Sequence, residues 1–250
     1  MAEKTFAELL EETTGNSRLM DAPLGARLKA VADMVTRLSP GFAAVVDRMV
    51  ARLEANNVGQ NAPQIGQPMP DFILPDEQGR LVRLENLLEQ GPVVVAFHRG
   101  HWCPYCKLNA DGLARIAPDI KRLGAQIVAI SPEIHQYGSE LKSFAHAPFP
   151  VLSDVDNGYA LVLNLLFWVG DEKRKAMKAG GFDIEPYNGN DTWMLPVPAT
   201  FVVGRDGLVR ARYIDPDYRR RMELDPIVAA VAALNDEAAT SVERRRLSAS

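Results

Sequence analysis

Two cysteines separated by two residues are the groups in this sequence best suited to chemistry. The motif Cys103-Pro104-Tyr105-Cys106 holds both cysteines of the 250-residue chain. It follows an apolar run at 92–97 that predicts a buried strand, and it precedes a segment at 107–123 whose apolar spacing predicts a helix. A Cys-x-x-Cys at such a turn places one sulfur at the helix N-terminus and the other one turn later on the same face.

This placement predicts a redox-active dithiol. Residues three apart on a helix lie roughly 5–6 Å from each other, which a disulfide can span. The unpaired N–H groups and the dipole at a helix N-terminus favour a thiolate at Cys103. Pro104 suits the first helical turn, where its missing N–H costs nothing. We therefore expect Cys103 and Cys106 to alternate between two thiols and one disulfide bond.

Composition narrows the class of protein and its compartment. The net charge of −4 argues against a nucleic-acid surface. The first residues lack the pattern of a signal peptide, and no apolar run approaches the ~20 residues of a membrane span. We therefore expect a cytoplasmic protein with no nucleic-acid or membrane partner. In such a reducing compartment a Cys-x-x-Cys is more often catalytic or metal-binding than structural.

A metal site and a scaffold are the non-enzymatic alternatives. A zinc site would need two further ligands besides the cysteines. The remaining nitrogen donors of this kind are four histidines: His98, His101, His135 and His146. A scaffold using the same fold would not need both thiols, although fold alone never guarantees activity. We expect no cofactor and no metal.

The chain divides into segments of different character. Residues 1–56 carry amphipathic helical patterns and predict a helical N-terminal extension. Residues 57–68 are rich in Asn, Gln, Gly and Pro and predict a linker. Residues 69–236 alternate strand and helix patterns, which predicts one α/β redox domain. Residues 237–250 are expected to form a disordered tail.

The expected elements follow from apolar periodicity and turn residues. Within the α/β domain we expect strands at 92–97, 126–131, 149–152, 200–203 and 208–214, and helices at 107–123, 138–146, 157–167 and 224–234. The polar segment 168–195 is expected to be an irregular insertion. In the extension the helices are expected at 6–12, 24–38 and 42–53.

Five stretches add a family resemblance to this pattern. They lie at 66–75 (GQPMPDFILP), 97–106 (FHRGHWCPYC), 127–132 (IVAISP), 149–154 (FPVLSD) and 198–203 (PATFVV). In this order they resemble the alkyl-hydroperoxide-reductase/thiol-specific-antioxidant (peroxiredoxin-like) family of the thioredoxin superfamily, in its subgroup with a Cys-x-x-Cys. The resemblance implies a thioredoxin-like fold, a central mixed sheet flanked by helices. It also implies an antioxidant oxidoreductase that reduces peroxides through a dithiol/disulfide cycle.

The resemblance assigns roles that fit only in part. The family loop is similar to Pro-x-x-x-Thr-x-x-Cys, whose last residue attacks peroxide. Without gaps, its Pro falls on Arg99, its Thr on Cys103 and its attacking Cys on Cys106. The arginine that the family supplies before a late strand falls on Pro198. The resemblance therefore implies attack by Cys106 and resolution by Cys103, with slower turnover because the supporting groups have changed.

A thioredoxin-like reading of the same residues remains open. It implies that Cys103 attacks a partner disulfide and Cys106 resolves the mixed disulfide. Pro198 would then be a cis proline facing the dithiol, Trp102 an aromatic that shields it, and Arg99 a cation that attracts the thiolate. The buried acid of thioredoxins corresponds to Ala96, so this pattern is incomplete as well. The alternative function is thus thiol-disulfide exchange without significant peroxidase activity.

The partners follow from the chemistry. We expect a peroxide or disulfide substrate and a thioredoxin-like or low-molecular-weight thiol as reductant. A homodimer is a further expectation.

Overall fold

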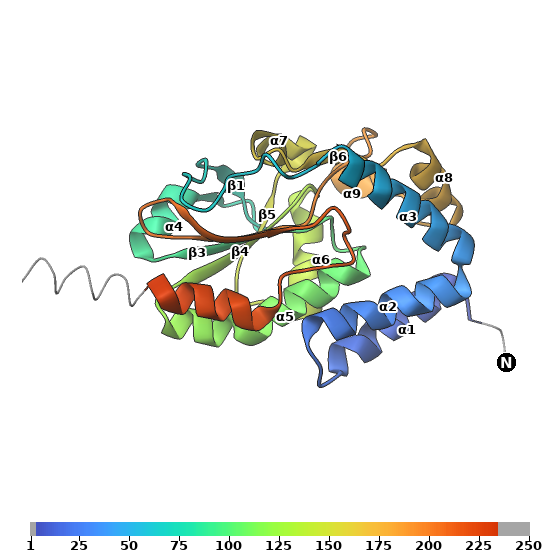
Figure 1. Ribbon diagram of the computed structural model, residues 1–250, viewed down its shortest axis with the longest axis horizontal. Coiled ribbons are helices and arrows are strands. Elements are labelled where there is room, and N and C mark those ends of the chain that lie inside the picture. Colours follow the sequence, from blue (N-terminus) through green and yellow to red (C-terminus); the bar gives the residue numbers. More distant parts are fainter. Residues whose placement is uncertain (1–3, 235–250) are drawn as a thin grey trace, which may run out of the picture.

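The computed structural model describes residues 4–234, so the expected tail at 237–250 lies outside the described residues. Its centre is a five-stranded sheet in the order β5-β4-β3-β8-β9 (Figure 1). The strands are β3 (Val93–Phe97), β4 (Gln126–Ser131), β5 (Val151–Ser153), β8 (Ala199–Val203) and β9 (Val209–Ile214). The β3–β4 and β4–β5 pairs are parallel, and the β3–β8 and β8–β9 pairs are antiparallel.

The middle strand β3 is buried along its whole length, as its unbroken apolar sequence predicts. Val95 lies opposite Val128 of β4 on one side and opposite Phe201 of β8 on the other. Its alternate residues enter two separate apolar clusters, one on each face of the sheet. The position of β3 also fixes the loop that follows it, which leads directly to Cys103.

Helices cover both faces. On one face lie α5 (Pro104–Arg122), α6 (His135–Ala145) and a helix over the described residues 224–234. The other face is covered by the hairpin of β1 (Ile73–Pro75) and β2 (Leu81–Arg83), with α4 (Leu84–Gln90), η1 (Val155–Asn157) and α7 (Gly158–Val162). This arrangement confirms the expected thioredoxin-like class, a mixed sheet flanked by helices.

The helix expected over 157–167 is wrong in its second half. The chain leaves α7 at Val162 and forms β6 (Leu166–Trp168), which pairs with β7 (Met194–Pro196). Phe167 is buried and Trp168 is exposed, so neighbouring side chains of β6 point to opposite sides, as in a strand. The segment between these strands is not irregular throughout, because it contains α8 (Asp171–Ala179) and α9 (Glu185–Asn188).

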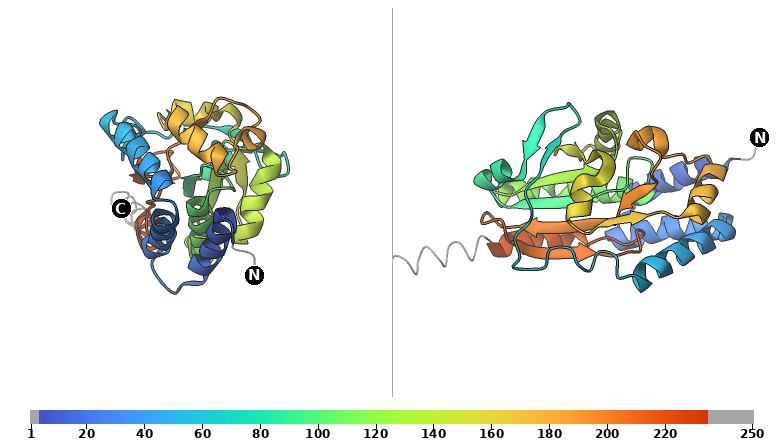
Figure 2. Two further views of the ribbon diagram at one scale, coloured as in Figure 1. Left: turned by 90° about the vertical axis from the view of Figure 1, so that its right-hand side faces the viewer. Right: turned by 90° about the horizontal axis from the view of Figure 1, so that it is seen from above.

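Three helices precede the sheet: α1 (Phe6–Leu19), α2 (Leu24–Leu38) and α3 (Pro40–Ala55). They gather at one end of the molecule, and the turned views show the same grouping (Figures 1 and 2). α1 and α2 pack on α5, and α3 packs on α8. Their apolar stripes join a cluster that also contains Cys103 and Cys106, so the extension shares a core with the dithiol. No helix among residues 4–234 is long and apolar enough to cross a membrane.

A buried carboxylate fastens α1 and α2 to α5. Asp111 of α5 accepts hydrogen bonds from Arg27 at 2.5 Å, from Arg18 at 2.8 Å and from Arg115 at 2.9 Å. Arg27 is 1% exposed, and its Nε also donates to the Ser17 carbonyl at 3.0 Å. Three cations from three helices therefore converge on a single buried anion.

The segment at 57–68 is held in place rather than free. The backbone N–H of Gly66 donates to the Val209 carbonyl at 2.8 Å, and the N–H of Val209 donates to the Gln67 carbonyl at 2.9 Å. Arg212 of β9 donates to the carbonyls of Ala62 and Pro63. This segment behaves as an added edge of the sheet, although its expected role as a domain boundary stays a prediction.

Asp111→Asn should lower the free energy of unfolding by about 3–5 kcal/mol, because it leaves the buried Arg27 guanidinium without its anion. Denaturant titration of the reduced protein measures this loss. Asp33→Asn is the matched control, since Asp33 pairs with Lys29 on the exposed face of α2 and should cost at most about 0.5 kcal/mol. Equal stabilities of the two variants would contradict the anchoring role of Asp111.

Candidate active site

The two cysteines lie at the first turn of α5, which packs against the N-terminal helices. Cys103 is the N-cap residue of α5 and Pro104 is its first helical residue, as the motif predicts. The backbone N–H groups of Cys106 and Lys107 both donate to the Cys103 carbonyl at 3.0 Å. Both cysteines are free thiols and buried. The helix start thus places both sulfurs in one apolar environment.

Cys103 has the character of a thiolate. Burial alone would raise its pKa, but a hydrogen bond from the Cys106 thiol and the charges of Arg99 and Arg221 outweigh it and lower the pKa to about 6. Arg99 Nη1 lies 4.0 Å from the Cys103 sulfur. At neutral pH this sulfur is therefore deprotonated and nucleophilic.

Cys106 has the opposite character. Burial, together with the hydrogen bond and the negative charge of Cys103, raises its pKa well above the usual value. Its sulfur accepts hydrogen bonds from the Arg99 backbone N–H at 3.2 Å and from Arg221 Nη2 at 3.4 Å. The pair therefore consists of one ionised sulfur and one protonated sulfur that is ready to give up its proton later.

Arg99 is held in place by aromatic rings. Its guanidinium carbon lies 3.7 Å from the ring centroid of Tyr218 and 4.9 Å from that of Trp102. Stacking of this kind fixes a planar cation without neutralising it. Gly100 makes the fold of the loop possible, because a Cβ there would lie 2.4 Å from the Trp102 indole nitrogen. Arg99 and Trp102, two of the expected supporting residues, thus contact each other next to the dithiol, and their roles stay predictions.

A pocket that is open to solvent is lined by Cys103. Its floor is formed by Arg99, Trp102, Cys103 and Tyr105, and its walls come from α1, α2, α3 and α8. The walls are mostly apolar side chains, among them Leu10, Val35, Phe42, Val46, Met177 and Phe182. Cys106 does not line this pocket.

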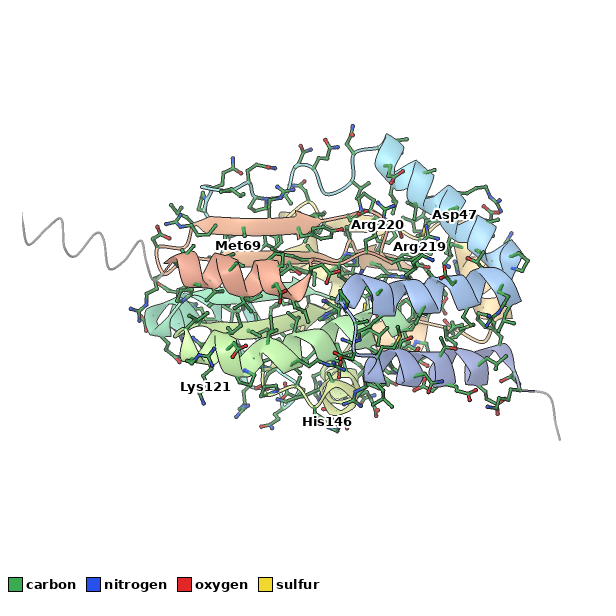
Figure 3. All side chains as sticks on the ribbon, turned by 60° about the horizontal axis from the view of Figure 1, so that its bottom comes forward. Asp47, Met69, Lys121, His146, Arg219 and Arg220 are labelled. Atoms are coloured by element: carbon green, nitrogen blue, oxygen red, sulfur yellow. The ribbon has the colours of Figure 1, made fainter. Side chains whose placement is uncertain are left out.

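At the rim of the pocket, an ion pair joins α3 to the segment that precedes the final helix. Arg219, from the segment that precedes the final helix, also lines the pocket. It donates to Asp47 of α3 at 2.7 Å and to Asp217 at 2.8 Å, and Figure 3 shows Asp47 and Arg219 near each other. Because its charge is matched by these two carboxylates, Arg219 is a poor partner for an incoming anion.

The expectation for Pro198 is wrong in its geometry. There are no cis peptide bonds among residues 4–234, so Val197–Pro198 is trans. The chain runs extended from β7 into β8, and the Val197 N–H donates to the Leu165 carbonyl at 2.7 Å. This pairing with the strand before α8 holds the backbone straight, and a trans peptide is the form that X–Pro bonds favour. Pro198 is buried and does not line the pocket.

Two histidines near the dithiol in the sequence bind side chains other than the cysteines. His98 is fully buried, and one of its ring nitrogens lies 2.9 Å from Asn109 Oδ1. His101 pairs with Glu133, through its ring nitrogen at 2.7 Å and its backbone N–H at 2.8 Å, and its ring stacks on Tyr137. Both histidines therefore brace the loop. Residues 4–234 contain no group of three or more His, Cys, Asp or Glu side chains that could hold a metal ion.

Three residues of the site were missed from the sequence: Lys173, Tyr218 and Arg221. Tyr218 and Arg221 lie in Tyr-Arg-Arg-Arg, a run of three arginines just before the final helix. That run could have indicated an anionic partner, because arginine side chains often form charge-assisted hydrogen bonds with anions. Lys173 gave no such signal, since it stands in a highly charged stretch that is typical of an exposed helix.

The fold and the paired sulfurs define a thiol-dependent oxidoreductase of thioredoxin-like architecture. Residues 65–212, more than half of the chain, match the AhpC/TSA family, and the protein belongs to that family.

Relatives of known name agree with this membership. The chain is 22% identical over 177 residues to the 1-Cys peroxiredoxin PER1 of Hordeum vulgare, covering 68% of this chain and 72% of that one. It is 27% identical over 141 residues to peroxiredoxin bcp1 of Schizosaccharomyces pombe, covering 54% and 70%. Among solved structures, peroxidoxin BcpB from Mycobacterium tuberculosis has a TM-score of 0.54 at 23% identity, over 69% of this chain and 98% of that one. This structural likeness concerns the fold.

The ultraviolet absorbance of thiolate in the reduced protein should rise as the pH increases through about 6, because the Cys103 pKa is lowered to that value. An ordinary cysteine would titrate at about 8.5. The Cys103→Ser variant should lose this step and leave a titration only above the ordinary range, from Cys106. A step near 6 that persists in Cys103→Ser and disappears in Cys106→Ser would reverse the assignment.

Proposed function

We propose that this protein reduces hydroperoxides through a dithiol/disulfide cycle in which Cys103 attacks and Cys106 resolves. The observation that carries the proposal is that Cys103, whose pKa is lowered, lines the pocket, whereas Cys106, whose pKa is raised, does not. The membership in the AhpC/TSA family supports peroxide as the oxidant.

The chemistry needs no cofactor. The Cys103 sulfur attacks the terminal oxygen of a hydroperoxide, the O–O bond breaks, and Cys103 becomes a sulfenic acid. The Cys106 thiol then condenses with it, a water molecule leaves, and the disulfide closes. Arg99, 4.0 Å from the Cys103 sulfur, is placed to balance the negative charge that moves from sulfur to oxygen.

The proposed order of the cysteines differs from the order that the family loop implies. The ungapped comparison puts the attacking position on Cys106, but the contacts around the two sulfurs support Cys103. Cys106 is 0% exposed and does not line the pocket, whereas Cys103 does. The cation that the family supplies before the late strand is absent at Pro198. Arg221 stands beside Cys106 instead.

The shape of the pocket supports a small apolar substrate. Side chains of three N-terminal helices and α8 surround the opening, and Cys103 itself is 1% exposed. An alkyl or aryl hydroperoxide can place its apolar body against Val35, Phe42 and Met177 while its O–O group reaches the sulfur. A large protein disulfide would have to displace these helices.

Thiol-disulfide exchange remains the second candidate, and one observation favours it. The pKa of Cys103 is lowered and that of Cys106 is raised. An exchange mechanism uses this difference, because the first cysteine attacks as a thiolate and the second reacts later. The walls of the pocket restrict this candidate to small disulfides. The two functions share the same intramolecular disulfide and differ in the oxidant.

The cycle requires an external reductant that returns both sulfurs to thiols. A thioredoxin-like protein or a low-molecular-weight thiol can supply the two electrons. A low-molecular-weight thiol fits the enclosed opening over Cys103 more easily than a protein does. The homodimer and the cytoplasmic location stay predictions.

One equivalent of an aryl hydroperoxide should convert both free thiols of the reduced protein into an intramolecular disulfide. Thiol labelling before and after oxidation measures this loss. Cys106→Ser should still react and stop at a sulfenic acid on Cys103, which a dimedone-type trap detects by mass. Cys103→Ser should react at least roughly 10²-fold more slowly, because a buried protonated thiol is a poor nucleophile. A sulfenic acid on Cys106 in Cys103→Ser at the wild-type rate would show that the family-like order is correct.

Stopped-flow mixing of the reduced protein with three oxidants separates the candidate functions. The peroxidase predicts fast oxidation by cumene hydroperoxide, slower oxidation by hydrogen peroxide and none by a protein disulfide. The exchange mechanism predicts that a small disulfide such as oxidised glutathione reacts faster than either peroxide. The second result would replace the first proposal.

A further inference from the structure

Lys173 of α8 is a buried amine in the wall of the pocket that holds Cys103. It is 2% exposed and lines the same pocket as Cys103, Arg99 and Tyr218. Its Nζ lies 3.4 Å from the ring centroid of Phe42 and donates to the Tyr218 hydroxyl at 3.5 Å. A side chain from the first turn of a charged helix is thus turned inward, into the pocket that Cys103 lines.

The surroundings of this amine make a proton easy to remove. Burial, together with the positive charges of Arg99 and Arg219, lowers the pKa of Lys173 to about 6, although the Cys103 thiolate acts in the opposite direction. Its two contacts, an aromatic ring and a phenol, stabilise an ammonium without the strength of a carboxylate. An amine that gains and loses a proton near neutral pH is suited to acid–base work.

The reaction proposed for this site produces a strong base. Cleavage of the O–O bond of an alkyl hydroperoxide releases an alkoxide, a strong base whose conjugate acid is, like water, a very weak acid. Against the mostly apolar walls of this pocket such an ion is poorly solvated, so a proton donor beside it favours its release. Arg99 cannot be the donor, since a guanidinium does not release its proton in proteins.

Building on the proposed peroxidase function, we propose that Lys173 is the proton donor to the departing alkoxide. The Cys103 thiolate attacks the terminal oxygen, a sulfur–oxygen bond forms, and the O–O bond breaks with its electron pair moving to the alkoxide oxygen. That oxygen takes a proton from the Lys173 ammonium and leaves as the alcohol. Cys103 is then a sulfenic acid, oxidised by two electrons, and Lys173 is a neutral amine that regains a proton from solvent.

Tyr218 has a supporting place in this arrangement. It lies between Arg99, whose guanidinium stacks on its ring, and Lys173, which donates to its hydroxyl. Burial raises the pKa of Tyr218, so the phenol is a much weaker acid than the Lys173 ammonium. Its hydroxyl accepts from the ammonium and so holds the amine in the pocket.

The test uses two peroxides that differ in leaving group. Cumene hydroperoxide releases an alkoxide, whereas 3-chloroperbenzoic acid releases a carboxylate with a conjugate-acid pKa of about 4, which needs no proton. In single-turnover stopped flow, Lys173→Met should slow the reaction with cumene hydroperoxide by roughly 10². The same variant should reduce the peracid within about threefold of the wild-type rate. The peracid also requires the Cys103 thiolate, so it controls for any change in that sulfur.

Matched variants and outcomes complete the test. Lys175→Met removes an exposed lysine of the same helix and should leave both rates unchanged. Equal slowing of both peroxides in Lys173→Met, or no slowing of either, would overturn the role of Lys173 while leaving the peroxidase in place. A loss selective for cumene hydroperoxide in Tyr218→Phe but not in Lys173→Met would assign the donor to the phenol instead. If wild-type protein reduces neither peroxide, the peroxidase proposal itself fails.

Discussion

The carboxylate of Asp111 is the constraint on which the site depends. One buried negative charge receives arginines from α1, α2 and α5, and this holds the N-terminal helices against the helix that carries both cysteines. The pocket walls contributed by Leu10, Val35 and Phe42 exist only while those helices are docked. A single ion cluster on the helix that carries Cys106 therefore controls whether Cys103 faces an enclosed apolar space or open solvent.

Two arginines lie near the dithiol, one beside each sulfur, and their positions help to set the protonation state of each cysteine. Arg99 stands on the pocket side beside Cys103, and Arg221 stands on the inner side beside Cys106. The family pattern supplies its support from a proline, a threonine and a strand arginine. Here the cations come from the loop itself and from the segment before the final helix. Positive charge near the sulfurs is thus supplied from different positions in the chain.

Much of this arrangement can be read from the sequence, because local patterns report local structure. The apolar run of β3, Pro104 at the start of α5 and the stripes of the N-terminal helices all specify their own elements. The β6–β7 pair could not be predicted from the sequence, because three-residue strands have too few residues to show a period. The trans geometry of Val197–Pro198 could not be predicted either, because it depends on the distant backbone group that binds Val197. Lys173, Tyr218 and Arg221 join Cys103 only through long-range packing, which no spacing in the sequence records.

The link between the two ends of the chain has a consequence for biosynthesis. The side chain of Glu223 accepts hydrogen bonds from the backbone N–H groups of Leu24 and Gly25, and so caps α2, which has no cap of its own. The same late segment supplies Tyr218 and Arg221. During translation the cysteines therefore leave the ribosome more than a hundred residues before Tyr218 and Arg221. The set of charges that lowers the Cys103 pKa is complete only after this late segment has been synthesised.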